Sequence, residues 1–269
     1  MRADLSACRL KLARAKRDLK ALDDKVGAYM DPPPFRFAIE PEGKGGKTIV
    51  FHIDREPDPE WAIDLGEIAY QSRSALDLLI VQLVIDNTDQ RPRGRTQFPI
   101  FTDRHEYITK GKRGSSNRDR MLAGVSGGHR HLIDTFQPYN RIGGVEDDPL
   151  SILSSITNRD KHRDIHVCLG SVEIPRFQLL QPLIDYQITV ELTGEKFRGY
   201  PMVDGQKFIG IGNVVPPRES PDATVELKIL PMDVSLAFYG DRLITMDDID
   251  AFVLRTERIL DAFTKRIKP

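Results

Sequence analysis

The spacing of apolar positions predicts a long helix at the start of the chain. Between residues 4 and 30, apolar side chains recur at alternating spacings of three and four, and most other positions are charged. These positions are Leu5, Cys8, Leu12, Ala15, Leu19, Leu22, Val26 and Tyr29. Such a heptad seam packs along one partner helix. The partner is either another helix of this chain or a second copy, which would form a homodimer through helix 4–30.

Two short alternating runs then predict a β-hairpin over residues 35–54. Apolar and polar residues alternate over residues 35–39 and again over residues 49–53, on either side of the glycine-rich segment EGKGGK. This alternation is typical of half-buried strands joined by a turn. The glycines and lysines lack the spacing of a phosphate-binding P-loop, so we expect an ordinary turn.

A second long helix is predicted from Asp58, with Asp58 as N-cap and Pro59 at the first helical position. From Ala75 onward it is apolar on nearly every side, which indicates a buried central helix. Arg73 and Asp77 lie four residues apart and therefore share a face of it. Because buried charges are costly unless paired, these two residues either pair with each other or orient a polar site on a neighbouring helix.

Shorter helices are expected between this helix and residue 165. Three of them should cover residues 103–110, 117–123 and 127–136. Ser126 is the expected N-cap of the third helix. A fourth helix should begin at Asp148, an N-cap followed by Pro149, with Leu153 and Ile156 pointing inward.

The second half of the chain has the alternating pattern of strands. Its runs are residues 186–192, 208–215, 225–229 and 234–238. Gly, Pro and Asp separate them at hairpin-like distances, so the sheet should be antiparallel. Thr245 and Asp248 are the expected cap of a final helix over about residues 246–267.

These elements predict an α+β fold in a single domain. A helical bundle over about residues 1–168 would carry the hairpin, a β-rich part would cover about residues 169–240, and the helix at about 246–267 would close the fold.

Composition indicates a soluble globular protein, with 40% hydrophobic and 29% charged residues among 269. Cys8 and Cys168 are the only cysteines, so no disulfide framework is expected and a reducing compartment is favoured. The N-terminus lacks a long apolar run, and the longest apolar stretch, Leu78–Ile85, is too short to span a bilayer. We therefore expect a cytoplasmic protein with no membrane partner.

Charge is distributed unevenly although the net charge is only −1. Residues 91–130, which we call the basic segment, hold ten Lys/Arg against three Asp/Glu. Such a surface either contacts phosphates of nucleic acid or is a solvated arginine-rich loop. The candidate nucleic-acid-binding residues are Lys110, Lys112, Arg113, Arg118, Arg120 and, further along, Arg163.

The segment NRDKHRDIH (Asn158–His166) is the strongest candidate for chemistry. Arginine positions and neutralises a phosphate, and histidine transfers a proton near neutral pH. RNA cleavage needs both and does not require a metal. The candidate catalytic residues are Arg159, His162 and His166, with Asn158, Asp160, Arg73 and Asp77 in orienting roles. The alternative is an ordinary helix end, where Lys, Arg and His complement the helix dipole.

Metal and cofactor sites are not expected. On a continuing helix His162 and His166 would have the spacing of two zinc ligands, with His129, His131 or Cys168 as further ligands. The chain has no HExxH or CxxC pattern and no nucleotide-binding fingerprint.

Four motifs carry a resemblance to known proteins. They are RSALDLLIVQL (Arg73–Leu83), FPIF (Phe98–Phe101), QPY (Gln137–Tyr139) and NRDKHR (Asn158–Arg163). In this order they resemble a group of uncharacterised bacterial and phage proteins with an RSALD helix and an N-x-D-K-H-R helix.

More remotely, the pair of helices is similar to HEPN domains. That resemblance implies a helical bundle, often dimeric, with metal-independent ribonuclease activity in toxin–antitoxin or phage-defence systems. In its signature four to six residues separate an Arg from a following His, and here six residues separate Arg159 from His166, with Asp160 at the polar position. Arg159 and His162 are too close for this signature. The segment at about 170–240 has no counterpart in a minimal HEPN domain.

Two functions of different classes follow. The first is an RNA-binding protein or metal-independent ribonuclease of a toxin or phage-defence type. The second is a non-enzymatic interaction protein that assembles through the heptad helix 4–30, with the NRDKHR cluster in a structural role.

Overall fold

The computed structural model describes residues 2–42, 46–92, 94, 96–111, 114–159, 165–170, 177–179, 187–192, 201–215, 227–229, 234–239 and 242–267. Helices and antiparallel strands make up an α+β fold, as predicted. The chain forms two compact units. We call Met1–Asp23, Glu60–Ile165 and Met246–Pro269 the helical unit, and Asp24–Pro59 with His166–Thr245 the strand unit. The single domain expected from the sequence stays a prediction.

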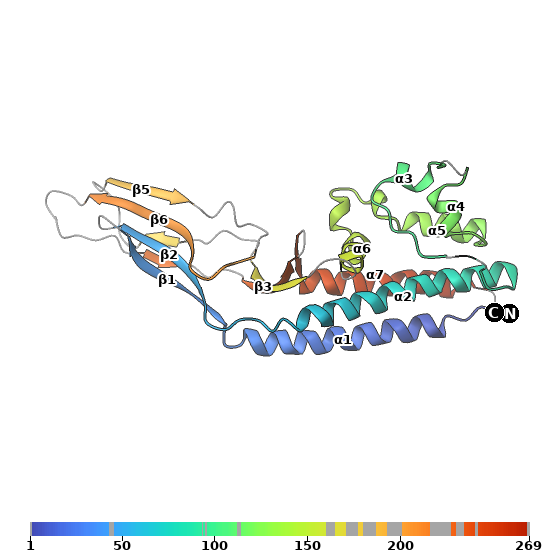
Figure 1. Cartoon of the computed structure of the whole chain (residues 1–269), viewed down its shortest axis with the longest axis horizontal. Coiled ribbons are helices and arrows are strands. Elements are labelled where there is room, and N and C mark those ends of the chain that lie inside the picture. Colours follow the sequence, from blue (N-terminus) through green and yellow to red (C-terminus); the bar gives the residue numbers. More distant parts are fainter. Residues whose placement is uncertain are drawn as a thin grey trace. The chain divides into compact units, whose positions relative to one another are not determined.

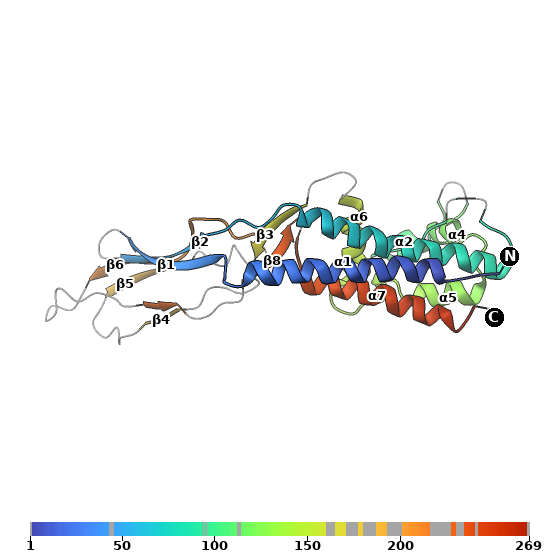
Figure 2. The same ribbon diagram turned by 90° about the horizontal axis from the view of Figure 1, so that it is seen from below.

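Long and short helices build the helical unit (Figure 1). They are α1 (Ser6–Met30, which continues into the strand unit after Asp23), α2 (Trp61–Thr88), α3 (Arg104–Ile108), α4 (Asn117–Met121), α5 (Gly127–Thr135), α6 (Pro149–Arg159) and α7 (Met246–Thr264). Two 3-10 turns, η1 (Pro138–Asn140) and η2 (Val145–Asp147), join α5 to α6. Figures 1 and 2 show α1, α2 and α7 running lengthwise beside one another.

The core of this unit lies where α6 and α7 pack against α2. Leu76 and Leu79 of α2, Leu153 of α6 and Phe252 of α7 are fully buried. Burial of each side chain of this size contributes about 1.5–3 kcal/mol to the free energy of folding, so the apolar stripes hold the helices together. The inward direction predicted for Leu153 and Ile156 is confirmed.

The heptad seam of α1 is buried within its own chain. Its most buried members are Cys8, Leu12, Ala15 and Leu22. Ion pairs beside the seam join α1 to α7, between Arg9 and Asp261 and between Lys16 and Glu257, both at 2.6 Å. The intrachain alternative therefore accounts for the seam. A homodimer through helix 4–30 stays a prediction, and it would need another face of the helix, where Leu10 is 72% exposed.

Most predicted helix starts are correct. Asp103, Ser116 and Ser126 each accept a backbone hydrogen bond as N-caps of α3, α4 and α5. Asp148 accepts the amide of Leu150 at 2.9 Å at the start of α6. The predicted start of α2 is wrong: its N-cap is Glu60, which makes no side-chain capping bond.

Helix α2 as a whole is long and apolar enough to cross a membrane, by length and composition only. Of its apolar window, 56% is buried against the rest of the unit. Such burial is typical of the core helix of a soluble protein.

Antiparallel strands build the strand unit. They are β1 (Phe35–Glu42), β2 (Gly46–Ile53), β3 (His166–Gly170), β4 (Phe177–Leu179), β5 (Gln187–Leu192), β6 (Gln206–Val215), β7 (Leu227–Ile229), β8 (Ser235–Tyr239) and β9 (Leu243–Thr245). They form three sheets, in the orders β1-β2-β6-β5, β3-β8-β9 and β4-β7.

The hairpin over 35–54 is confirmed, but its assignment to the helical part is wrong. Strand β2 pairs with β6 as well as with β1, so the hairpin belongs to the sheet of the second half. An isolated two-stranded hairpin is marginally stable, and this pairing supplies the further strands it needs.

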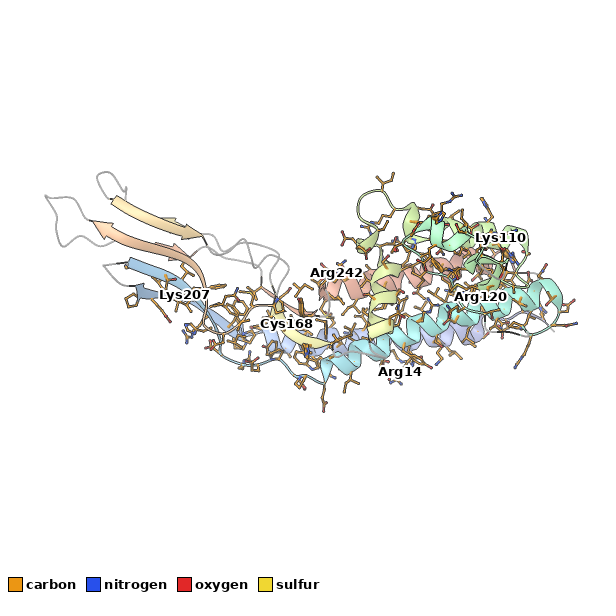
Figure 3. The ribbon with its side chains drawn as sticks, turned by 45° about the horizontal axis from the view of Figure 1, so that its top comes forward. Arg14, Lys110, Arg120, Cys168, Lys207 and Arg242 are labelled. Carbon is orange, nitrogen blue, oxygen red and sulfur yellow. The ribbon has the colours of Figure 1, made fainter. Side chains whose placement is uncertain are left out.

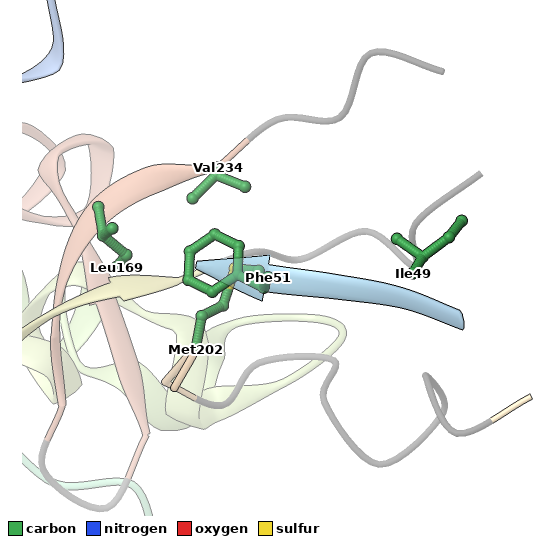
Figure 4. Close-up of a cluster of buried hydrophobic side chains, with 5 residues drawn as sticks. All are labelled: Ile49, Phe51, Leu169, Met202 and Val234. Atoms are coloured by element: carbon green, nitrogen blue, oxygen red, sulfur yellow. The ribbon is translucent and has the colours of Figure 1, made fainter. Parts of the chain in front are cut away.

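A compact apolar cluster holds this unit together (Figure 4). Its members are Ile49, Phe51, Leu169, Met202 and Val234. The ring of Phe51 also stacks against Phe35 and Phe37 of β1, with centroids at 5.6 and 5.3 Å. Residues far apart in the sequence thus form one core.

Candidate functional site

The segment with the predicted catalytic residues follows α6. Helix α6 ends at Arg159, and Asn158 beside it is exposed, away from the inward face of Leu153 and Ile156. The predicted site residues Asp160, His162 and Arg163, together with Lys112 and Arg113, lie outside the described residues. Of Arg159, only the backbone is described.

His166 is the first residue of β3 and pairs with Tyr239 of β8. Its side chain is exposed. Because residue 166 is extended, the helical spacing that would make His162 and His166 a zinc-ligand pair is wrong. Among the residues that the structure describes, no group of three or more His, Cys, Asp or Glu side chains is placed to hold a metal ion.

Arg73 and Asp77 of the RSALD motif pair with each other on α2, at 3.0 Å. The same two side chains hold the backbone of Phe98. Arg73 donates to the carbonyl of Phe98 at 2.7 Å, and the backbone amide of Phe98 donates to Asp77 at 2.8 Å. The first of the two predicted alternatives, mutual pairing, is therefore observed. In the described part of the chain their further hydrogen bonds go to Phe98 rather than to α6, and the orienting role toward residues 158–166 stays a prediction.

A second motif holds the same FPIF segment. Gln137 of the QPY motif is 1% exposed. Its amide nitrogen donates to the carbonyl of Pro99 at 2.9 Å, and its amide oxygen accepts the amide of Phe101 at 3.2 Å. Three of the four motifs that carry the resemblance thus form one network, in which RSALD and QPY fix FPIF against α2.

Asp134 of α5 accepts hydrogen bonds from two side chains of the basic segment. Arg118 of α4 donates to both oxygens of Asp134, the closer at 2.7 Å, and the Tyr107 hydroxyl donates to it at 3.0 Å. The hydrogen bond with Asp134 raises the pKa of Arg118, and burial raises the pKa of Tyr107. Arg118, predicted to bind nucleic acid, is therefore engaged in an internal ion pair.

Two of the three acids of the basic segment, Asp103 and Asp119, are used internally, and the third, Glu106, is exposed. Asp103 caps α3. Asp119 forms the capping box of α4 with Ser116, and hydrogen bonds from Ser116 lower the pKa of Asp119. Its carboxylate also lies 3.6 Å from Arg130. Capping and internal pairing thus occupy carboxylates that would otherwise neutralise the surface.

Several bases of this segment face solvent. Arg91, Arg104, Lys110 and Arg120 are exposed, and none of them makes an ion pair with any residue the structure describes. Figure 3 marks Lys110 and Arg120 in the part of the helical unit that carries α3 to α5. Arg91 and Arg120 line one groove of about 290 Å³.

Arg104 lines a second groove, of about 470 Å³, together with His131 and Tyr139. Burial raises the pKa of Tyr139, so its hydroxyl stays protonated at neutral pH. The groove therefore offers a guanidinium, an imidazole and a phenol to one ligand. Sequence reasoning considered His131 only as a metal ligand and did not single out Tyr139.

The two cysteines are poor nucleophiles. Burial raises the pKa of Cys8 to about 11 and that of Cys168 to about 12. Thiolate is the reactive form of cysteine, so neither thiol is activated at neutral pH.

The chain matches no protein-family model, no curated protein and no solved structure.

Proposed function

We propose that the helical unit binds RNA through its basic segment. The observation that supports this most directly is how the charges of this segment are used. The carboxylates of Asp103 and Asp119 serve as helix caps, while Arg91, Arg104, Lys110 and Arg120 remain exposed without ion pairs among the described residues. Phosphate contacts by Lys and Arg supply most of the affinity of a protein for nucleic acid. His131 and Tyr139 add an imidazole and an aromatic ring beside Arg104 for stacking on unpaired bases.

We propose further that the chain cleaves RNA without a metal ion. Arg159 and Arg163 would hold the phosphate, and His162 and His166 would act as base and acid. What supports it is the sequence of the segment and the exposure of Asn158 at the end of α6. A role in toxin or phage-defence systems and a cytoplasmic location belong to the same proposal.

RNA binding is tested by fluorescence anisotropy with a labelled single-stranded RNA. We expect the triple variant Arg91→Gln/Arg104→Gln/Arg120→Gln to bind at least about tenfold more weakly, because the loss of even one charge-assisted contact removes about 1.5 kcal/mol. Arg17→Gln/Lys265→Gln/Arg266→Gln removes the same charge from exposed positions outside the basic segment and should bind like the wild type. Equal affinity of the two triple variants would refute binding through the basic segment.

Cleavage is tested separately, in EDTA, by gel analysis of the same RNA. The wild-type chain should cleave it, and His162→Ala/His166→Ala should bind RNA but not cleave it. If the wild type leaves the RNA intact, or the double variant cleaves equally well, the ribonuclease proposal fails while RNA binding stands.

The second candidate is an assembly protein, which the exposure of Leu10 on α1 favours. If α1 forms a homodimer, it does so through this open face, since the heptad seam is buried. Light scattering should then show a dimer that Leu10→Asp converts to a folded monomer. A wild-type chain that is monomeric at all concentrations removes this candidate.

A further inference from the structure

A polar cavity of about 370 Å³ lies between η1, the start of α6 and the middle of α7. We call it the arginine groove, after its charged lining of Arg141, Arg255, Arg258 and Asp148. Arg141 follows η1, and Arg255 and Arg258 lie one turn apart on α7. The volume is within the range of pockets that hold small molecules, about 300–1,000 Å³.

No carboxylate in the described part of the chain pairs with these arginines. Arg141 donates to the carbonyl of Asp147, and Arg255 donates to the carbonyl of Phe136 at 3.3 Å. Arg258 makes neither a hydrogen bond nor an ion pair with a described residue. Other arginines do pair with carboxylates, namely Arg9, Arg14, Arg36, Arg73, Arg118 and Arg130.

Arg255 is positioned by an aromatic ring and has a side-chain donor without an acceptor. Its guanidinium lies over the ring of Phe136, 5.2 Å from the centroid, which limits its rotation. Its Nε is buried and has no hydrogen-bond partner among the described residues. A buried donor without an acceptor is unfavourable, so Arg255 has hydrogen-bonding capacity left for an anion in the groove that it lines.

Charge identifies the class of anion. Three arginines and one aspartate line the groove, and the carboxylate of Asp148 accepts the amide of Leu150 in capping α6. The lining therefore carries two net positive charges. A phosphate monoester carries about 1.5 to 2 negative charges at pH 7 and three terminal oxygens, which guanidinium groups bind in a bidentate manner. A phosphodiester carries one charge and matches the groove less well.

We propose that the arginine groove binds a phosphate monoester. The ligand is either a phosphorylated small molecule such as a nucleoside monophosphate or the 5′-phosphate end of an RNA. The groove shares no arginine with the basic segment, so the inference stands independently of the proposed function; only the RNA-end source rests on it.

Calorimetric titration of the full chain with AMP and with adenosine tests the site. AMP should bind and adenosine should not. Arg258→Gln and Arg141→Gln, both at exposed positions, should each weaken AMP binding about tenfold or more, while Arg17→Gln on α1 should leave it unchanged. Affinity should also fall as the pH drops from 7.5 to 5, because the phosphate loses its second charge near pH 6.

A second comparison separates the two sources. If a 5′-phosphorylated RNA binds more tightly than the same RNA with a 5′-hydroxyl, and Arg258→Gln removes the difference, the ligand is an RNA end. If the two RNAs bind equally while AMP binds, the ligand is a small molecule. The proposal is overturned if AMP does not bind at millimolar concentration, or binds the wild type and both groove variants equally. RNA binding that persists in that case leaves the proposed function intact.

Discussion

Two places in the helical unit use arginine in opposite ways. At the FPIF segment, Arg73 is 17% exposed and pairs with Asp77, and the pair holds the backbone of Phe98. In the arginine groove, Arg141, Arg255 and Arg258 line one cavity and pair with no carboxylate among the described residues. The pair at FPIF neutralises its charges within the chain and fixes the backbone, whereas the arginines of the groove keep their positive charge available to a ligand. Removing charge should therefore cost stability at FPIF and binding at the groove.

The largest effect on stability is expected at FPIF. Asp77→Ala removes the acceptor of the Phe98 amide and the partner of Arg73, and it should lower the free energy of unfolding by about 3 kcal/mol. Asp77→Asn keeps an acceptor oxygen and should lose less. Urea denaturation measures both, and an unchanged midpoint for Asp77→Ala would show that the pair is not structural.

A smaller loss is expected at the second ion pair. Arg118→Gln removes the bidentate contact with Asp134, and we expect a loss of about 2 kcal/mol in the same assay. Tyr107→Phe, which removes one neutral donor to Asp134, should cost about 1 kcal/mol. Equal losses would mean that the charge of Arg118 adds nothing.

The capping box of α4 gives a pH-dependent effect of about 1 kcal/mol. Hydrogen bonds from Ser116 lower the pKa of Asp119 below its ordinary value of 3.8, so this stabilisation is present above that pH and is lost as the pH falls below it. Ser116→Ala should therefore be less stable than the wild type at pH 7, and the difference should shrink toward pH 3. A difference that is constant with pH would contradict the role of the carboxylate.

The smallest effect on stability is expected at the arginine groove. Arg258→Gln removes an exposed charge that makes no hydrogen bond or ion pair with a described residue, so the free energy of unfolding should change by no more than about 0.5 kcal/mol. A loss comparable to that of Arg118→Gln would show that the groove arginines are structural, and the contrast between the two places would disappear.

Local patterns in the sequence predicted most of the helices. The apolar stripe of α1, the inward positions of α6 and the caps Ser126 and Asp148 depend on neighbouring residues, so they can be recognised without the fold. The pairing of β2 with β6 joins residues about 160 positions apart, and hydrophobic alternation does not reveal which strand will be the neighbour.

The sites were harder to predict for the same reason. Arg73 and Asp77 were recognised as a pair, but their partner is a backbone group more than 20 residues away, which no side-chain pattern marks. The arginine groove combines Arg141 with Arg255 and Arg258, both of which lie over 100 residues after Arg141 in the sequence. Only the packing of α7 near η1 and α6 brings these residues to one cavity.

The salt dependence of RNA binding tests the central claim, that unpaired bases of the helical unit contact phosphates. For single-stranded RNA, the slope of log K against log salt concentration is about −0.7 per phosphate contact. We predict that Arg91→Gln/Arg104→Gln/Arg120→Gln makes the slope shallower by about 2, and that the control Arg17→Gln/Lys265→Gln/Arg266→Gln leaves it unchanged. The same slope for the wild type and the basic-segment variant would contradict the account.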